Sequence, residues 1–280
     1  MEVIRSRSHA LVQTLRKLAS DPALRRELSL CVLPGERLIE DWIRQGAKLN
    51  KVLIPARWLA KPESAQTLLR WQIGSHEAGM SADEAAGWFL LEGGLAEGVS
   101  GLGFETVPIA LASFCEQASL PAGGLEADWL YLDSVQDPGN LGTIIRTAAA
   151  FGVQTCVPGP GCADMWSPKT LRAAMGAHRR LDIVAVHEFA ALAGCFEGPI
   201  RAADAGGQLA HWHDLRSPGL WVLGSEGRGL SPEIRDHPRV IRYAIPMQKQ
   251  TESLNAAMAQ GILLYEQYRQ RQGGLSPSDR

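Results

Sequence analysis

The stretch 132–153 combines a sharp polar turn with the start of a helix, and it constrains the fold more than any other part of the chain. The apolar run 129–132 that precedes it is typical of a buried strand. Residues 136–140, Gln-Asp-Pro-Gly-Asn, favour a turn, because proline fixes φ and glycine and asparagine tolerate left-handed backbone. From Leu141 the apolar spacing becomes helical, and Gly152 is expected to end the helix. Ligands of open α/β sheets bind at such junctions between a strand and a helix.

Arg146 lies six residues after Asn140, too far for the two to be ordinary i,i+4 neighbours on a helix surface. We expect Arg146 to face the buried side of this mostly apolar helix, where an arginine needs an anionic or carbonyl partner. It could bind a ligand, or it could bond a neighbouring carbonyl or close an ion pair. The stretch alone favours the ligand-binding and structural interpretations equally.

Two further polar loops follow predicted strands in the second half of the chain. Loop 223–231 carries three glycines that let the backbone approach a ligand closely, and Ser231 followed by proline is typical of a helix start. A phosphate-cradling loop is the alternative, but the Gly-Lys-Ser/Thr ending of a P-loop is absent. Loop 245–255 leads into the final helix, which we expect Ser253 to cap, with Asn255 in its first turn. Three such loops at the carboxyl ends of strands in one sheet favour a ligand site.

The length of 280 residues and the pattern of elements predict an α/β protein of two domains. Strands alternate with helices in the second half, which is typical of a largely parallel sheet. We expect a small α/β domain over 1–107, a linker over 108–127 and the parallel-sheet domain over 128–280. Strands are predicted at 28–33, 51–55, 101–107, 129–132, 155–157, 183–186, 200–203, 220–223 and 240–245. Helices are predicted at 8–18, 36–45, 64–71, 81–89, 109–124, 141–151, 168–176, 188–196 and 253–269.

Charge is distributed unevenly along the chain, although the net charge is only −2. Residues 1–57 carry eleven Lys and Arg against six Asp and Glu, a net charge of +5. Residues 58–130 carry two against ten, a net charge of −8. The whole chain therefore lacks the overall basicity of many nucleic-acid binders, but its amino-terminal part favours a basic face.

The five cysteines are scattered and show neither a CxxC pair nor a nearby histidine at metal-ligand spacing. They are typical of reduced residues in a cytoplasmic protein, and we expect no metal site, His211 and His213 included. No apolar run approaches the roughly 18 residues of a membrane span. The start of the chain also lacks the apolar core of a signal peptide. The sequence therefore predicts a cytoplasmic protein with no membrane association.

The three polar loops resemble the signature motifs of the SpoU-class RNA 2′-O-ribose methyltransferases of the SPOUT superfamily. The matching segments, in the family's order and spacing, are 137–146, 224–230, and 245–247 with 253–255. The amino-terminal half resembles, more loosely, the substrate-binding domain that many members carry. The resemblance implies a carboxyl-terminal α/β trefoil-knot domain that binds S-adenosylmethionine, preceded by a small α/β RNA-binding domain. It also implies a homodimer whose substrate is RNA, with rRNA favoured over tRNA by analogy.

The resemblance also implies which residues form the site. Cofactor contacts are expected at Leu223, Gly224, Ile245, Met247 and Leu254. The reactive end is expected to consist of Asn140, Arg146, Glu226, Ser253 and Asn255. Because the charge excess lies in the first 57 residues, RNA contacts are expected from Arg5, Arg7, Arg16 and Lys17.

These residue types suit methyl transfer to a ribose hydroxyl, which must be aligned with the methyl group and lose its proton. Family proposals make the equivalent of Arg146 the proton acceptor, yet a guanidinium normally stays protonated above pH 12. Arg146 could instead hold the adjoining phosphate or stabilise a developing alkoxide. Glu226 could orient Arg146, while Asn140 and Asn255 could fix the ribose or the loop geometry.

Lys249 departs from the family pattern, which usually has glycine at this place in the third motif, and Ala174 stands where a serine is common. Neither change removes a residue of catalytic type, so the enzyme interpretation is favoured. Two alternatives stay open. One is an RNA-binding protein that keeps the fold without turnover, and the other is a nucleotide-phosphate enzyme that uses the loop 224–229.

Overall fold

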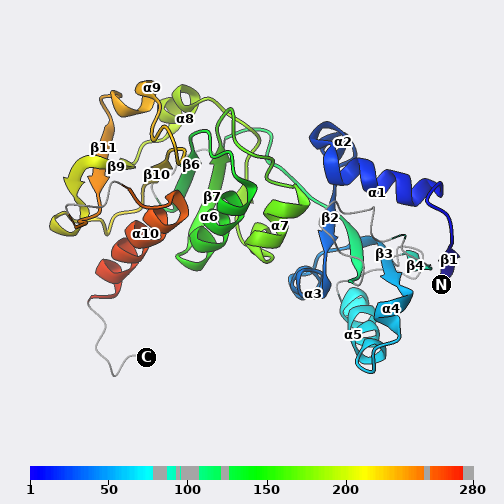
Figure 1. Cartoon of the computed structure of the whole chain (residues 1–280). Coiled ribbons are helices and arrows are strands. Elements are labelled where there is room, and N and C mark those ends of the chain that lie inside the picture. The colour runs from blue at the N-terminus through cyan, green and yellow to red at the C-terminus, as the bar shows by residue number, and fades with distance from the viewer. Residues whose placement is uncertain (78–86, 93–94, 96–106, 121–125, 249–252, 274–280) are drawn as a thin grey trace. The chain divides into compact units, whose positions relative to one another are not determined.

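The computed structural model describes residues 1–77, 87–92, 95, 107–120, 126–248 and 253–273. The chain divides into two compact units, shown with their elements in Figure 1. The first comprises Met1–Cys115 together with Asp164–Arg179, and the second comprises Glu116–Ala163 together with Arg180–Arg280. The chain therefore passes between the units at three places, and a short segment from its second half belongs to the first unit.

The first unit is built on a mixed five-stranded sheet in the order β1-β4-β3-β5-β2. Strands β1, β4 and β3 run parallel, whereas β5 is antiparallel to both β3 and β2. The strands are β1 Glu2–Ile4, β2 Leu30–Pro34, β3 Leu49–Pro55, β4 Gly87–Leu91 and β5 Ile109–Ser113. The helices are α1 Ala10–Ser20, α2 Pro22–Leu28, α3 Glu36–Arg44, α4 Ala56–Leu59, α5 Ser64–Glu77 and α7 Pro168–Ala174.

Among the helices of this unit, α1 buries the face that the sequence predicts, whereas α2 was not expected from the sequence. Val12, Leu15 and Leu18 follow one another at helical spacing in α1, and all three are fully buried in the core. Asp21 caps α2 by accepting hydrogen bonds from two backbone N–H groups, and proline occupies the first helical position. The expected helices at 8–18, 36–45 and 64–71 are thus confirmed with shifted ends.

Two predictions in the first unit are wrong. The connector 109–124 was expected to be helical, but Ile109–Ser113 forms the strand β5 between β3 and β2. The expected helix 81–89 ends in strand β4, which begins at Gly87, and residues 81–86 lie outside the described part of the chain. Both are short apolar runs, buried in β5 and mostly half-buried in β4, and in such short runs periodicity does not separate strand from helix. Residues 101–106 of the expected strand 101–107 also lie outside the described part.

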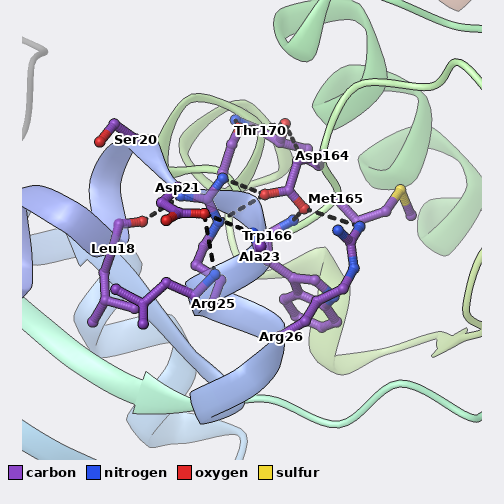
Figure 2. A network of polar contacts seen from close by, with 12 residues as sticks. Leu18, Ser20, Asp21, Ala23, Arg25, Arg26, Asp164, Met165, Trp166 and Thr170 are labelled. Carbon is purple, nitrogen blue, oxygen red and sulfur yellow. Dashed lines mark hydrogen bonds and ion pairs between the residues drawn. The ribbon is translucent and has the colours of Figure 1, made fainter.

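The segment 164–179 is held within the first unit by a buried ion pair, drawn in Figure 2. The Arg25 guanidinium donates to the Asp164 carboxylate at 2.7 Å, and the two side chains are 3% and 10% exposed. Arg25 also donates to the Leu18 carbonyl. Trp166 stacks on Phe114 with ring centroids 4.2 Å apart. A charge pair and an aromatic stack therefore fasten this segment.

The second unit contains a six-stranded, wholly parallel sheet in the order β11-β9-β10-β6-β7-β8, which confirms the predicted fold class. The strands are β6 Asp128–Leu132, β7 Val153–Pro158, β8 Asp182–Ile183, β9 Ile200–Leu209, β10 Leu220–Leu223 and β11 Val240–Ala244. The helices are α6 Pro138–Ala150, α8 Phe189–Cys195, α9 Pro232–Arg235 and α10 Ala256–Gln272.

Helices cover both faces of this sheet, as parallel sheets require. Helices α6 and α10 pack side by side on one face (Figure 1). Residues of α8 and α9 pack against the other face, in a core that contains Trp129, Phe189 and Ile234. Strands β6 and β10 are neighbours in register, with Leu132 opposite Leu223. The loops that leave them, and the loop that leaves β11, therefore emerge at the same edge of the sheet.

Candidate functional site

The first loop carries Asn140 into the first turn of α6. Asp137 caps this helix by accepting a hydrogen bond of 2.8 Å from the Asn140 N–H, and Pro138 occupies the first helical position. The side chain of Asn140 is thereby directed to other loops. Its Nδ2 donates to Glu226 Oε1 at 2.6 Å, and its Oδ1 accepts from Asn255 Nδ2 at 3.1 Å. The structure thus brings together three of the five residues expected at the reactive end.

Asn255, not Ser253, caps the final helix. Its Oδ1 accepts hydrogen bonds from the N–H groups of Ala257 and Met258, at 3.0 and 3.4 Å, and α10 begins at Ala256. The expectation that Ser253 caps this helix is therefore wrong. Serine and asparagine are both good N-cap residues, so the sequence alone did not fix the helix start. The side-chain oxygen of Asn255 therefore caps α10, while its side-chain nitrogen donates a hydrogen bond to Asn140.

The second loop folds back on itself through a tight turn. The backbone groups of Ser225 and Gly229 exchange hydrogen bonds of 3.1 and 2.9 Å, and Gly229 has a φ of +66°. Gly224 packs against the backbone of Gly229 so closely that a Cβ at this position would collide with it. The Ser231 N–H donates to Asp133 Oδ2 at 2.6 Å, which fastens this loop to the end of β6. Ser231 precedes α9 as predicted, but its side chain makes no capping hydrogen bond.

The second and third loops, with parts of β9 and α10, line a cavity of about 350 Å³, within the roughly 300–1,000 Å³ range of small-molecule sites. All the residues expected to contact the cofactor line it: Leu223, Gly224, Ile245, Met247 and Leu254. Glu226 and Ser253 of the expected reactive end line it as well, and Asn140 and Asn255 are joined to Glu226. The motif residues thus converge on one site.

Arg146 does not lie where it was expected. Leu141, Ile144, Ile145 and Ala148 of α6 are buried, whereas Arg146 is exposed. Residues on the buried face of a helix recur every three or four positions, as 141, 144, 145 and 148 do here. Position 146 is out of step with this pattern and therefore lies on the opposite, solvent-exposed face. Within the described residues, Arg146 has no hydrogen bond or ion pair. Glu226 accepts a hydrogen bond from Asn140 and does not contact Arg146. The expectation that Arg146 faces the buried side of the helix and has a protein partner there is therefore wrong.

The expected RNA-binding residues lie in or beside β1 and α1. Arg5, Arg7 and Lys17 are exposed, and Arg16 is half-buried. Arg5 Nε donates to Glu92 Oε2 at 2.8 Å, and this hydrogen bond raises the pKa of the guanidinium. Lys249 of the third loop lies outside the described residues. In the part of the chain that is described, no group of three or more His, Cys, Asp or Glu could hold a metal ion.

Sequence reasoning missed one wall of the cavity. Ala203, Asp204 and Ala205 of β9 line it, and so do Arg228 and Arg235. Strand β9 was expected to end at residue 203, and no motif marks the residues beyond that point. The chemical signal was present as an aspartate just after a predicted strand, at the edge of the sheet where ligands bind.

Among the residues that the structure describes, no helix combines the length and hydropathy of a membrane span. The parallel sheet and its cavity define an α/β domain with a cavity of small-molecule size at the carboxyl ends of its strands. A sequence model of the SpoU rRNA Methylase family matches residues 129–265 of this domain. An uncharacterized tRNA/rRNA methyltransferase of Synechocystis is 32% identical, with 98% of this chain and 96% of that protein covered.

Two other known proteins are also similar over nearly their whole lengths. The 23S rRNA (guanosine(2553)-2′-O)-methyltransferase of Bacillus subtilis is 29% identical, with 95% of this chain and 98% of that protein covered. The AdoMet-bound rRNA methyltransferase of Sinorhizobium meliloti has a TM-score of 0.75 at 22% identity, covering 98% and 99% of the two chains, which shows a shared fold. The chain belongs to the SpoU rRNA methylase family. It is an RNA methyltransferase of the SPOUT class, as its motifs predicted.

Proposed function

We propose that this chain is an S-adenosylmethionine-dependent RNA 2′-O-ribose methyltransferase that acts on ribosomal RNA. The observation that carries the proposal is that the second and third family motifs line one cavity, while Asn140 of the first motif is hydrogen-bonded to Glu226 and Asn255 beside it. The relative from Bacillus subtilis is named for 2′-O-methylation of a guanosine in 23S rRNA. A tRNA substrate is the alternative. We also propose that the second unit contains the trefoil knot implied by the family resemblance.

The residues of the cavity fit S-adenosylmethionine. Leu223, Ile245 and Leu254 supply apolar walls suited to an adenine ring, and Asp204 and Arg235 add charge. Gly224 and Gly229 of the glycine-rich loop line the cavity. Because they have no side chains, the backbone of the loop packs closely there and its polar groups can face a ligand. When bound, the cofactor supplies an electrophilic methyl group. The motif residues on the wall would hold it mainly through backbone groups and apolar contact.

The polar residues beside the cavity would bind and orient the ribose. Glu226 accepts from Asn140, and Asn255 donates to Asn140, so the amide of Asn140 has a fixed orientation. Exposed Arg146 is available to bind the phosphate next to the target ribose, or to stabilise negative charge on the 2′-oxygen.

The test is to map 2′-O-methyl groups by mass spectrometry in the RNA of a strain that lacks this gene, and to restore one with the purified protein. We expect one 2′-O-methyl group to disappear from rRNA and to return with protein and S-adenosylmethionine. Loss from tRNA would support the alternative substrate. Folded protein that binds no S-adenosylmethionine by calorimetry at millimolar concentration would refute the enzyme. ATP or GTP binding instead would support the nucleotide-phosphate alternative.

The enzyme is also proposed to be a homodimer, as in other family members. Helix α10 supports this, because it exposes four large side chains of apolar or aromatic type on its outward surface: Met258 (58% exposed), Ile262 (38%), Tyr265 (54%) and Tyr268 (43%). Such a surface is typical of a protein interface. Light scattering at micromolar concentration should give twice the chain mass, and a monomer would contradict the proposal.

A cytoplasmic location completes the proposal. The cysteines are all free, and Cys31 and Cys156 are buried, as in proteins of reducing compartments. Burial raises the pKa of both thiols well above the usual value, so neither is suited to act as a nucleophile. Fractionation of cells that express the tagged chain tests the location.

A further inference from the structure

A break in the sheet places a short segment of β9 on the wall of the cavity. Ile200, Arg201 and Ala202 pair with β11 in register, but the pairing resumes only at Gln208, opposite Tyr243. Residues 203–207 are thus left out of the β9–β11 ladder. Bulges of this kind lie next to active sites in many proteins, where they redirect side chains.

The bulge has a fixed conformation. Gly207 packs against the backbone of Arg242 and Tyr243, where a Cβ would collide with main-chain atoms. The Gly206 N–H donates to Asp204 Oδ1 at 2.9 Å, which closes a turn inside the bulge. Because backbone contacts and a side-chain hydrogen bond hold the bulge, the position of Asp204 is set by the fold.

Asp204 brings a carboxylate to the cavity. Its side chain is 18% exposed, and Asp204 lines the cavity together with Ala203 and Ala205. Arg242 Nη1 donates to Oδ2 at 3.1 Å, and Arg235 Nε lies 3.9 Å from the same oxygen. A carboxylate can accept about four hydrogen bonds. Within the described residues Asp204 accepts two, so it has acceptor capacity left for a ligand.

We propose that Asp204 accepts hydrogen bonds from the ribose hydroxyls of S-adenosylmethionine, an inference that rests on the function proposed above. Two adjacent hydroxyls match the oxygens of one carboxylate, and acidic residues at strand ends bind ribose in other nucleotide-binding sheets. The α-ammonium group of the cofactor is the wrong match, because Arg228, Arg235 and Arg242 surround this wall with positive charge. The adenine amino group is also a poor match, since the acceptor nitrogens beside it would face the carboxylate.

The test measures ligand affinity by calorimetry. Asp204→Asn keeps an oxygen for the Gly206 N–H but loses the charge and the acceptor capacity of the second oxygen. The ligands are S-adenosylhomocysteine and 5′-methylthioadenosine, which has the same adenosine but no amino-acid end. We expect Kd to rise about tenfold or more for both ligands, the scale of losing a hydrogen bond to a charged group. Asp214→Asn is the matched control, because Asp214 is exposed, pairs with Arg216 and does not line the cavity.

Three results would separate the causes. A loss for S-adenosylhomocysteine alone would place Asp204 at the ammonium group and overturn the inference, and equal affinities of variant and wild type would do the same. 2′-Deoxy-5′-methylthioadenosine should bind the wild type more weakly than its parent, with a smaller difference in Asp204→Asn.

Damage to the bulge is tested with Arg242→Gln, which removes a partner of Asp204 but leaves its carboxylate. This variant should stay within about threefold of the wild type, since it removes no group assigned to the ribose. An equal loss in Arg242→Gln would attribute the effect to the fold and overturn the inference. A folded wild type that binds neither ligand would refute the proposed function itself, which is a different outcome from a loss confined to one variant.

Discussion

Asn140 donates a hydrogen bond of 2.6 Å to Glu226, although 86 residues separate the two in the sequence. Asn255 donates in turn to Asn140 at 3.1 Å and caps α10. One line of hydrogen bonds therefore joins the first turn of α6, the glycine-rich loop and the start of α10. Each of these segments contributes a family motif, so the three motifs are held together as one site beside the cavity.

Asn255→Ala should weaken both the fold and the site. Loss of the cap costs about 1 kcal/mol, which lowers Tm by roughly 2–4 °C. Cofactor affinity and turnover should fall together, because Leu254 lines the cavity next to the cap. Calorimetry and a methylation assay measure the two effects. Asn255→Asp is the informative comparison, since aspartate caps a helix but cannot donate to Asn140. Wild-type turnover in Asn255→Asp would show that this hydrogen bond is unnecessary.

Arg146→Ala should reduce turnover on RNA by a factor on the order of 10² or more, the scale of losing a charge-stabilising group. Cofactor affinity and Tm should change little, because Arg146 is exposed and does not line the cavity. Single-turnover kinetics with saturating RNA and cofactor give the measurement. Arg146→Lys keeps the charge but not the planar fork, so substantial recovery would favour simple charge stabilisation. Wild-type turnover in Arg146→Ala would remove this residue from the catalytic assignment.

Breaking the buried pair in the first unit should be costly. Arg25→Met removes the close, buried partner of Asp164 and leaves only the half-exposed Arg26, 3.6 Å away, so the loss should lie near the lower end of the roughly 3–5 kcal/mol for a broken buried pair. Urea unfolding measures the change. Arg70→Gln breaks the exposed pair with Glu40 and should change stability by less than about 0.5 kcal/mol. Adding Asp164→Leu to Arg25→Met should recover a large part of the loss, because no uncompensated charge remains. Similar losses in Arg25→Met and Arg70→Gln would contradict the assigned importance of burial.

Acid should destabilise the first unit through His178. Burial lowers the pKa of this histidine to about 4, from 6.5 for an accessible imidazole. The unfolded chain then binds the proton more readily than the folded chain between pH 6.5 and pH 4. Stability is therefore full above pH 6.5 and falls through this window by up to about 1.4 kcal/mol per pH unit.

Urea unfolding between pH 4 and pH 7 tests this expectation with His178→Asn as the comparison. Asparagine does not titrate, so the variant should lose less stability across the window than the wild type. His213→Asn serves as a control for the substitution, because His213 is only half-buried and lies in the other unit. Identical pH slopes for wild type and His178→Asn would contradict the role of His178.

The parallel sheet and its three loops could be predicted from the sequence, because their signals are local. Strands β6 and β10 are apolar runs that end in turn residues, and α6 shows the expected buried spacing at Leu141, Ile144 and Ile145. Trp129 in β6 and Trp221 in β10 are both buried. The sequence placed the three motif loops directly after strands, and the strands of a parallel sheet end at the same edge, so the meeting of these loops could be predicted.

The features that the sequence missed depend on contacts between distant residues. Strand β5 has an alanine-rich pattern that also suits a helix, and only its pairing with β2 and β3 decides the matter. The bulge at 203–207 arises from the register of β9 against β11, which no local pattern encodes. The choice of Asn255 over Ser253 as a cap likewise involves Asn140, which is 115 residues away.

RNA binding by the first unit is tested by replacing Arg5, Arg7, Arg16 and Lys17 together with glutamine. Each phosphate contact that is lost should reduce the dependence of log K on log salt by about 0.7–0.9, so the loss of four contacts should lower the magnitude of the slope by up to about 3.6. Arg5 pairs with Glu92, and it should therefore contribute less than Arg7 when each is replaced alone. Filter binding at several salt concentrations gives the slope, and calorimetry should show unchanged cofactor affinity.

The control replaces an equal number of basic residues elsewhere in the same unit, so that the net charge changes identically: Arg44, Arg57, Lys61 and Arg70. We expect this control to bind RNA more tightly than the first variant at every salt concentration, because position as well as charge determines phosphate contact. Equal weakening by the two variants would mean that RNA responds only to the overall charge of the unit. The assignment of the surface at β1 and α1 would then be wrong.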